Sequence, residues 1–143
     1  MALLRPAHSA VTAEFLRFCA VGGVGFVVDG GLLTLLMEVF GLGPYSARVV
    51  SFLSAATVTW LLHRNFTFRR TEGSRRRQWV RFLAVNGIGA VLNYGVYAAC
   101  VAFAPHPFSV PQVALVIGAA LALGFNYLSS RFYVFAAAPE TGP

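Results

Sequence analysis

Four long apolar runs constrain this chain more than any other feature of its sequence. They extend over about residues 15–40, 45–62, 80–103 and 110–129, and each is 18 residues or longer. A helix of that length crosses the roughly 30 Å hydrocarbon core of a bilayer. Only 11% of the residues are charged, which is too few to cover a water-soluble core. The runs therefore predict an all-α integral membrane protein with four transmembrane helices.

The positive charges predict how these helices are oriented. The chain has eleven arginines and no lysine, and ten of the arginines lie before the first run, in the middle loop, or near the inner ends of the runs. Arg48 alone lies on the other side. By the positive-inside rule, both termini and the middle loop are cytoplasmic. This asymmetry favours a topology signal over nucleic-acid binding, so no nucleic acid is expected as a partner. Lipid-headgroup or partner contact stays open as a second role for the arginine run at 69–77.

An internal repeat relates the two halves of the chain. Phe15–Gly31 aligns with Trp79–Gly95 with 8 identities in 17 positions, and Ala47–Phe68 aligns with Ala114–Phe135 with 6 in 22. Each half contains two spans, so both would enter the membrane in the same direction. We expect one domain over 13–135, built of two parallel two-helix repeats at 15–68 and 79–135, between tails at 1–12 and 136–143.

Small residues recur every fourth position on the second and fourth runs. The rows are positions 47, 51, 55, 59 and 63, and positions 114, 118, 122, 126 and 130. Such rows let helix backbones approach closely in lipid, which favours a packing role. The polar ends of the rows, Thr59/His63 and Asn126/Ser130, are candidates for more than packing.

Asp29 lies about fourteen residues into the first run, and Asn93 is its repeat partner. An ionisable side chain near mid-membrane is costly and normally faces the interior of the helix bundle. Two interpretations stay open: a hydrogen bond between helices, or a substrate or proton site. Glu38 and Arg48 are both expected near the outer interface, where they could pair.

Four arginines occupy repeat-equivalent positions at one depth: Arg17 with Arg81, and Arg64 with Arg131. Guanidinium groups form forked hydrogen bonds to phosphate oxygens, which a lysine cannot match geometrically. The alternative is ordinary anchoring of helix ends at the interface.

The sequence lacks the residue patterns of an enzyme site. It contains no G-x-G-x-x-G fingerprint, no nucleophile elbow, no paired carboxylates and no Cys/His cluster with metal-ligand spacing. We therefore expect a non-enzymatic protein with no cofactor and no bound metal.

The segment from Phe15 to Gly25, with Asp29, Ala47 and Ser51, and the stretch His63-Arg-Asn-Phe-Thr-Phe68 resemble the GtrA-like family of small bacterial membrane proteins. The resemblance implies flipping of polyprenyl-phosphate-linked monosaccharides across the cytoplasmic membrane for cell-envelope polysaccharide synthesis. It also implies a multi-pass protein of that membrane. Related four-span domains anchor polyprenyl-phosphate mannose synthases, which offers an alternative role as a non-catalytic anchor or recruiter of a glycosyltransferase.

In the flipping interpretation, the arginines hold phosphate and the polar groups within the spans meet sugar hydroxyls. The expected phosphate ligands are Arg17, Arg64, Arg81 and Arg131, and the expected sugar ligands are Asp29, Asn93, Asn126 and His63. The expected partners are the lipid-linked sugar and membrane lipid, with a membrane glycosyltransferase and a second copy of the chain as further candidates. A small proton-coupled antiporter with Asp29 as proton carrier is the less favoured alternative.

Overall fold

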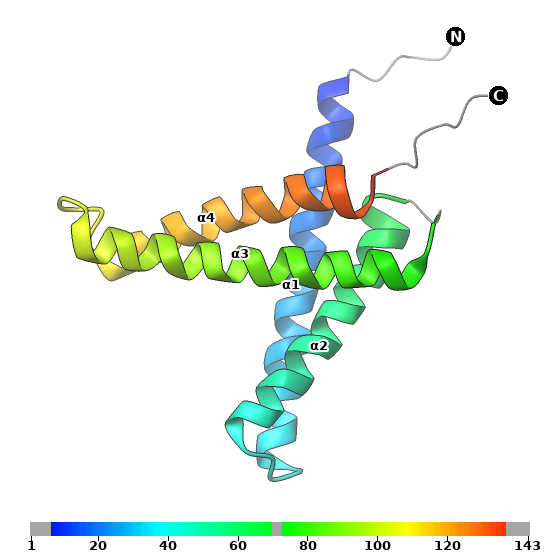
Figure 1. Ribbon diagram of the computed structural model, residues 1–143, viewed down its shortest axis with the longest axis horizontal. Helices are drawn as coiled ribbons and strands as arrows, with labels where there is room; N and C mark the ends of the chain where they lie inside the picture. The colour runs from blue at the N-terminus through cyan, green and yellow to red at the C-terminus, as the bar shows by residue number, and fades with distance from the viewer. Residues whose placement is uncertain (1–6, 70–72, 137–143) are drawn as a thin grey trace. The chain divides into compact units, whose positions relative to one another are not determined.

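The computed structural model describes residues 7–69 and 73–136 of the chain (Figure 1). Over these residues the fold is all-helical, with four long helices and no strand. Each of the four helices is long and apolar enough to cross a membrane, over Ser9–Glu38, Pro44–Thr67, Arg75–Phe103 and Pro111–Val134. The predicted four-span, all-α membrane fold is therefore confirmed.

The chain divides into two compact units, Met1–Glu72 and Gly73–Pro143, and each is described by itself. The first unit is a helical hairpin in which α1 (Ala7–Glu38) and α2 (Pro44–Leu62) lie side by side (Figure 1). A single turn of π-helix, η1 (His63–Thr67), continues α2. At 1.5 Å per residue, the 32 residues of α1 span about 48 Å, more than the hydrocarbon core requires.

The turn of this hairpin is set by glycine and proline. Gly41 has φ +65°, in the left-handed region where a Cβ would clash, and the Leu42 N–H donates to Leu36 O at 3.0 Å. Pro44 is the first residue of α2, where its missing N–H leaves no helical hydrogen bond unmade. The turn therefore determines where α2 begins.

The seam between α1 and α2 consists of the small-residue row at positions 47, 51, 55, 59 and 63. Every member of the row is buried, and the predicted packing role is confirmed. The two helices lie in close contact at Gly25, where an added Cβ would fall 2.3 Å from Thr59 Cγ2. The missing side chain of this glycine lets the Thr59 methyl group lie against the α1 backbone.

The second unit is also a helical hairpin, of α3 (Arg75–Phe103) and α4 (Pro111–Ser129), with the π-turn η2 (Ser130–Val134) continuing α4. In its small-residue row, positions 114, 118, 122 and 130 are buried and 126 is half-buried. The α4 backbone lies close to α3 at Gly118, where an added Cβ would fall 2.7 Å from the Asn93 carbonyl oxygen. The two units are thus built in the same element order.

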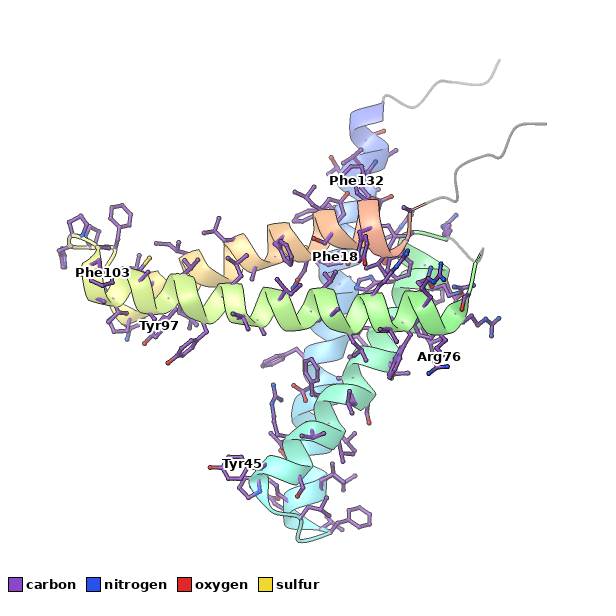
Figure 2. The ribbon with its side chains drawn as sticks, viewed as in Figure 1. Phe18, Tyr45, Arg76, Tyr97, Phe103 and Phe132 are labelled. Atoms are coloured by element: carbon purple, nitrogen blue, oxygen red, sulfur yellow. The ribbon has the colours of Figure 1, made fainter. Side chains whose placement is uncertain are left out.

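Large apolar side chains are exposed along all four helices; Phe26 on α1, for example, is 81% exposed. In water such a surface would drive association, whereas lipid tails match it. Figure 2 shows Tyr45 and Phe103 at the turn ends of their hairpins, and both side chains are largely exposed. Tyrosine and other aromatic rings favour the membrane interface, which is where these turns would lie.

The helices extend beyond the predicted runs at the ends opposite the turns. α3 begins at Arg75 instead of residue 80, because Ser74 caps it by accepting a hydrogen bond from the Arg77 N–H at 3.4 Å. The second and fourth spans continue to Thr67 and Val134 through their π-turns. Hydropathy locates the lipid-facing part of a helix, whereas a cap sets its end.

Several sequence predictions stay predictions. The orientation of the termini and the parallel arrangement of the repeats belong to this group, as do the domain bounds 13–135. Arg5 and Arg70, which contribute to the topology signal, lie outside the described residues, as do residues 1–6 of the first predicted tail and 137–143 of the second.

Candidate functional site

The second helix of each unit ends in a π-turn that carries a predicted phosphate-binding arginine. Arg64 lies in η1 and Arg131 lies in η2. The bonds that close these turns run from the Phe68 N–H to His63 O, 2.9 Å, and from the Phe135 N–H to Ser130 O, 2.8 Å. Single π-turns are rare in proteins overall, but those that occur often lie at functional sites. Sequence reasoning missed this geometry, although the stretches 63–68 and 130–135 were already aligned in the repeat.

An aromatic cluster supports the π-turn of the first unit. The rings of Phe18 and His63 stack with centroids 4.6 Å apart, and Phe68 meets Phe18 edge-on at 6.3 Å. His63 Nδ1 and Thr67 Oγ1 share a hydrogen bond of 3.0 Å. His63, predicted to contact sugar, is only 2% exposed. The structure thus places it among packed rings.

The stack also fixes the level of two predicted phosphate ligands. Arg17 is the chain neighbour of Phe18, and Arg64 is the chain neighbour of His63. Both arginines therefore lie at the end of the first unit opposite its turn. Arg17 is exposed, whereas Arg64 is 3% exposed. Of the two, Arg17 is the one that an approaching anion would meet first.

The two arginines of the second unit contact aromatic side chains. The Arg81 guanidinium lies over the Tyr133 ring, 4.9 Å from its centroid. Arg131 Nη1 donates to the Tyr127 hydroxyl at 3.0 Å, and its guanidinium lies 5.4 Å from the Phe132 centroid. Cation–π contacts hold a guanidinium in place while leaving its N–H edges able to bind an anion. Both arginines are half-buried.

The two asparagines predicted to bind sugar lie at close contacts between α3 and α4. Asn93 faces Gly118, and Asn126 faces Gly89, where an added Cβ would fall 2.1 Å from Asn126 Oδ1. In the described part of the second unit, two buried side-chain oxygens have no hydrogen-bond partner, Asn126 Oδ1 of α4 and Ser130 Oγ of η2. An unpaired polar atom is costly in a membrane protein, so a hydrogen bond from a ligand to either oxygen would be favourable.

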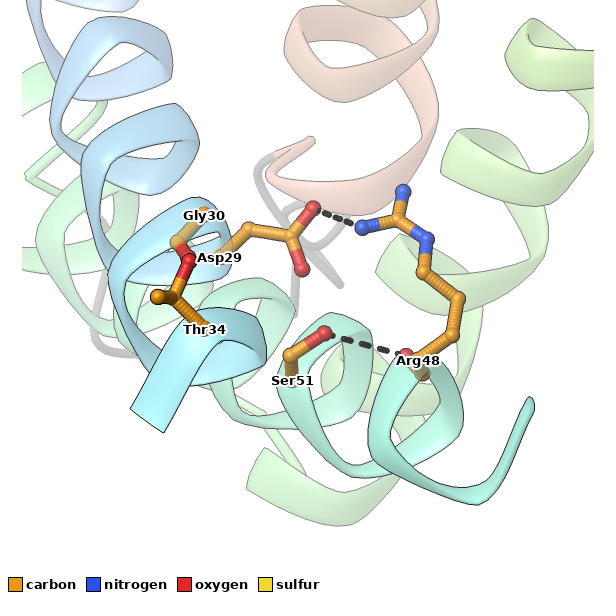
Figure 3. A network of polar contacts seen from close by, with 5 residues as sticks. All are labelled: Asp29, Gly30, Thr34, Arg48 and Ser51. Atoms are coloured by element: carbon orange, nitrogen blue, oxygen red, sulfur yellow. Dashed lines mark hydrogen bonds and ion pairs between the residues drawn. The ribbon is translucent and has the colours of Figure 1, made fainter. Parts of the chain in front are cut away.

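Asp29 pairs with Arg48. Figure 3 shows the two side chains reaching toward each other from α1 and α2, with Arg48 Nη1 against Asp29 Oδ2. The expected partner of Arg48 was Glu38; the structure pairs it with Asp29 instead. Asp29 lies nine residues before the end of α1, about 13 Å by helical rise, and the long Arg48 side chain reaches down to it. Asp29 therefore lies on the turn side of the centre of its span, between the mid-span and the turn.

These placements separate the predicted site into two levels within the first unit. Asp29 is twelve residues from Arg17 on α1, about 18 Å along the helix axis. The arginines lie at the π-turn level, and Asp29 lies near the turn of the hairpin. In the second unit, Arg81 and Arg131 lie together at the π-turn level, while Asn93 lies farther along α3.

The family described as "GtrA/DPMS, transmembrane domain" matches residues 17–135. This chain belongs to the GtrA/DPMS family. The match covers both units and includes all eight predicted site residues, and it confirms the resemblance found in the sequence.

GtrA/DPMS membership, together with the four apolar helices, makes this a multi-pass membrane protein. The GtrA family is linked to flipping of glycosyl-carrier lipids or to sugar biosynthesis, and its members are generally non-catalytic, flippase-like membrane proteins. Across residues 7–69 and 73–136, no three His, Cys, Asp or Glu side chains form a group that could hold a metal ion.

Proposed function

We propose that this GtrA/DPMS protein translocates a polyprenyl-phosphate-linked monosaccharide across the cytoplasmic membrane for cell-envelope polysaccharide synthesis. The observation that carries the proposal is the arginine in a π-turn at the same end of both units, with a second arginine at the same level on the preceding helix. A lipid phosphate at the inner leaflet requires cations at that depth, and each unit would supply two guanidiniums at its π-turn end.

In the first unit the phosphate would meet the exposed Arg17, and in the second unit it would meet the half-buried Arg81 and Arg131. Arg64 is too buried for direct contact in the described state, so its engagement requires η1 to rearrange. A π-turn contains one residue more than an α-turn, and conversion to α-geometry would rotate the residues that follow it.

The sugar carries hydroxyl groups that would otherwise lose their hydrogen bonds in the bilayer core. Asp29 Oδ1 and Asn126 Oδ1 are buried acceptors without a partner among the described residues, which supports their role as sugar ligands. Asn93 supplies an amide on α3 for the same purpose. A sugar could reach His63 only after Phe18 moved from its stacked position, so we leave His63 out of the proposed contact set.

The test is leaflet exchange with the purified protein alone. The full chain is reconstituted in liposomes with a panel of fluorescent polyprenyl-phosphate sugars, and a membrane-impermeant quencher reports the fraction that has crossed. We expect accelerated exchange for at least one sugar and no acceleration of a neutral phospholipid probe. Protein-free liposomes and liposomes with an unrelated four-span protein are the controls.

A second function is favoured by the family itself, whose description covers transmembrane domains of DPMS as well as GtrA. In that reading the protein recruits or anchors a membrane glycosyltransferase without moving lipid. Failure to exchange any lipid-linked sugar, together with co-purification of a glycosyltransferase from native membranes, would favour recruitment over translocation.

A further inference from the structure

The Asp29–Arg48 ion pair lies near the turn of the first unit, far from the other arginines. The Arg48 side chain is 55% exposed, and the Asp29 side chain is 19% exposed. Neighbouring hydroxyls serve the backbone and not the pair: Thr34 Oγ1 donates to Gly30 O, and Ser51 Oγ donates to Arg48 O (Figure 3). Within the described residues, Arg48 therefore has one side-chain partner, and most of its N–H donors remain open to a ligand.

The sequence places no other arginine or lysine in the turn half of this hairpin. Arg48 is the only arginine or lysine between residues 18 and 63, and there is none between residues 82 and 130. A phosphate that has left the arginines at the π-turn end would next meet a guanidinium at Arg48.

The spacing makes any phosphate site at Arg48 separate from one at Arg64. The two arginines are sixteen residues apart on the α2–η1 helix, about 24 Å along its axis. A single sugar joined to one phosphate is far shorter than this. The lipid phosphate cannot contact both arginines at once, so binding at Arg48 would be a second, distinct position.

We propose that Arg48 is the cation that binds the phosphate of the lipid-linked sugar at the outer face, and that Asp29 positions Arg48 for this role. The inference rests on the proposed function. Asp29 occupies one edge of the guanidinium, and the exposed edge binds the phosphate through forked hydrogen bonds. The ion pair carries no net charge, so Arg48 binds the phosphate through its N–H donors more weakly than an unpaired arginine would. Weaker binding lets the phosphate leave this site.

The second unit supplies a natural control. At the positions equivalent to Asp29 and Arg48 it has Asn93 and Leu115, which are uncharged. The double variant Asp29→Asn/Arg48→Leu therefore copies a pair that the same fold already accommodates. It removes both charges together, so neither is left alone in the membrane.

The experiment measures leaflet exchange of a polyprenyl-phosphate sugar by the full-length protein in liposomes. The wild type, Asp29→Asn/Arg48→Leu, Arg48→Lys and the nearby control Thr34→Ala are compared after thermal melting in detergent confirms folding. We expect exchange by the double variant to fall about tenfold or more, from the loss of a charge-assisted contact. Arg48→Lys should be intermediate, and Thr34→Ala should match the wild type.

A second measurement identifies the ligand. Polyprenyl phosphate without sugar, added to the outside, should slow wild-type exchange, and inorganic phosphate at the same concentration should not. Equal inhibition by inorganic phosphate would overturn the assignment to a lipid. If the double variant does not fold, Arg48→Lys decides, because unchanged sensitivity to polyprenyl phosphate would refute a role for the forked guanidinium.

The two proposals fail in different ways. A folded double variant that exchanges lipid at the wild-type rate would overturn the role of Arg48 and leave translocation intact. A wild type that exchanges no lipid-linked sugar would overturn the proposed function and this inference with it.

Discussion

Substitution of Gly118 by alanine should destabilise the second unit more than any conservative change on the same helix. The added Cβ would fall 2.7 Å from both the carbonyl oxygen and Oδ1 of Asn93. An ordinary carbon–oxygen contact is longer, and the carbonyl belongs to the α3 backbone, which cannot turn away as a side-chain tip can. The two helices must therefore move apart along the contact.

The magnitude follows from two opposing terms. Overpacking of a tight contact costs about 1–3 kcal/mol. Replacement of a helix-interior glycine by alanine returns about 0.8–1 kcal/mol of helix propensity. The net change should be a loss of up to about 2 kcal/mol of unfolding free energy. Loss of the Asn93–Gly118 fit also moves a proposed sugar ligand, so exchange activity should fall with stability.

Gly124→Ala on α4 is the matched control. An added Cβ at Gly124 meets nothing within 4 Å, so the same substitution keeps only the propensity gain. Both variants and the wild type are unfolded by SDS titration in mixed micelles, and the free energies are compared. If Gly118→Ala is as stable as Gly124→Ala, the close helix contact described here is incorrect.

Three further outcomes are expected. A cysteine reporter at Gly43 should label from outside intact cells and one at Ser74 only from inside; labelling of Ser74 in intact cells would refute the orientation. Arg131→Ala should weaken binding of a polyprenyl-phosphate sugar about tenfold or more, with partial recovery in Arg131→Lys, because charge-assisted contacts contribute about 1.5–3 kcal/mol; unchanged binding by folded protein would reduce Arg131 to an anchor. Asp29→Asn should keep substantial exchange, because asparagine retains an acceptor of similar size, while Asp29→Leu should lose most of it. If the two Asp29 variants are equally inactive and the wild-type rate follows a pH gradient, a proton carrier is the better description.

The four spans could be predicted because one criterion, apolar length, decides membrane insertion, and the sequence states it directly. The packing seam could also be predicted from the sequence. Small residues four apart share a helix face, and burial of the row that contains Ala47 and Ser51 follows from that spacing. Both predictions depend only on residue size and helical period.

Other features depend on geometry that the sequence does not encode locally. No residue in the stretches 63–68 and 130–135 breaks an α-helix, so the π-turns arise from packing, as in the stack of Phe18 on His63. The partner of Arg48 could not be predicted from the helix ends, because its long side chain reaches down to Asp29 and past the expected Glu38. The burial of His63 is likewise a tertiary result.

The two units agree at one end and differ at the other, and this difference bears on how a single lipid could be moved. At the π-turn end the matched ring contacts are nearly the same, 6.3 Å at 64° for Phe18–Phe68 and 6.2 Å at 62° for Phe82–Phe135, and each unit has two arginines beside them. At the turn end the first unit has Asp29 with Arg48, where the second has uncharged residues. Under the proposed function, each unit would offer two arginines to a phosphate at the inner face, whereas only the first unit would offer a guanidinium at the outer face. An outer site with one guanidinium would retain the lipid less than an inner site with two, since release then requires only one contact to break.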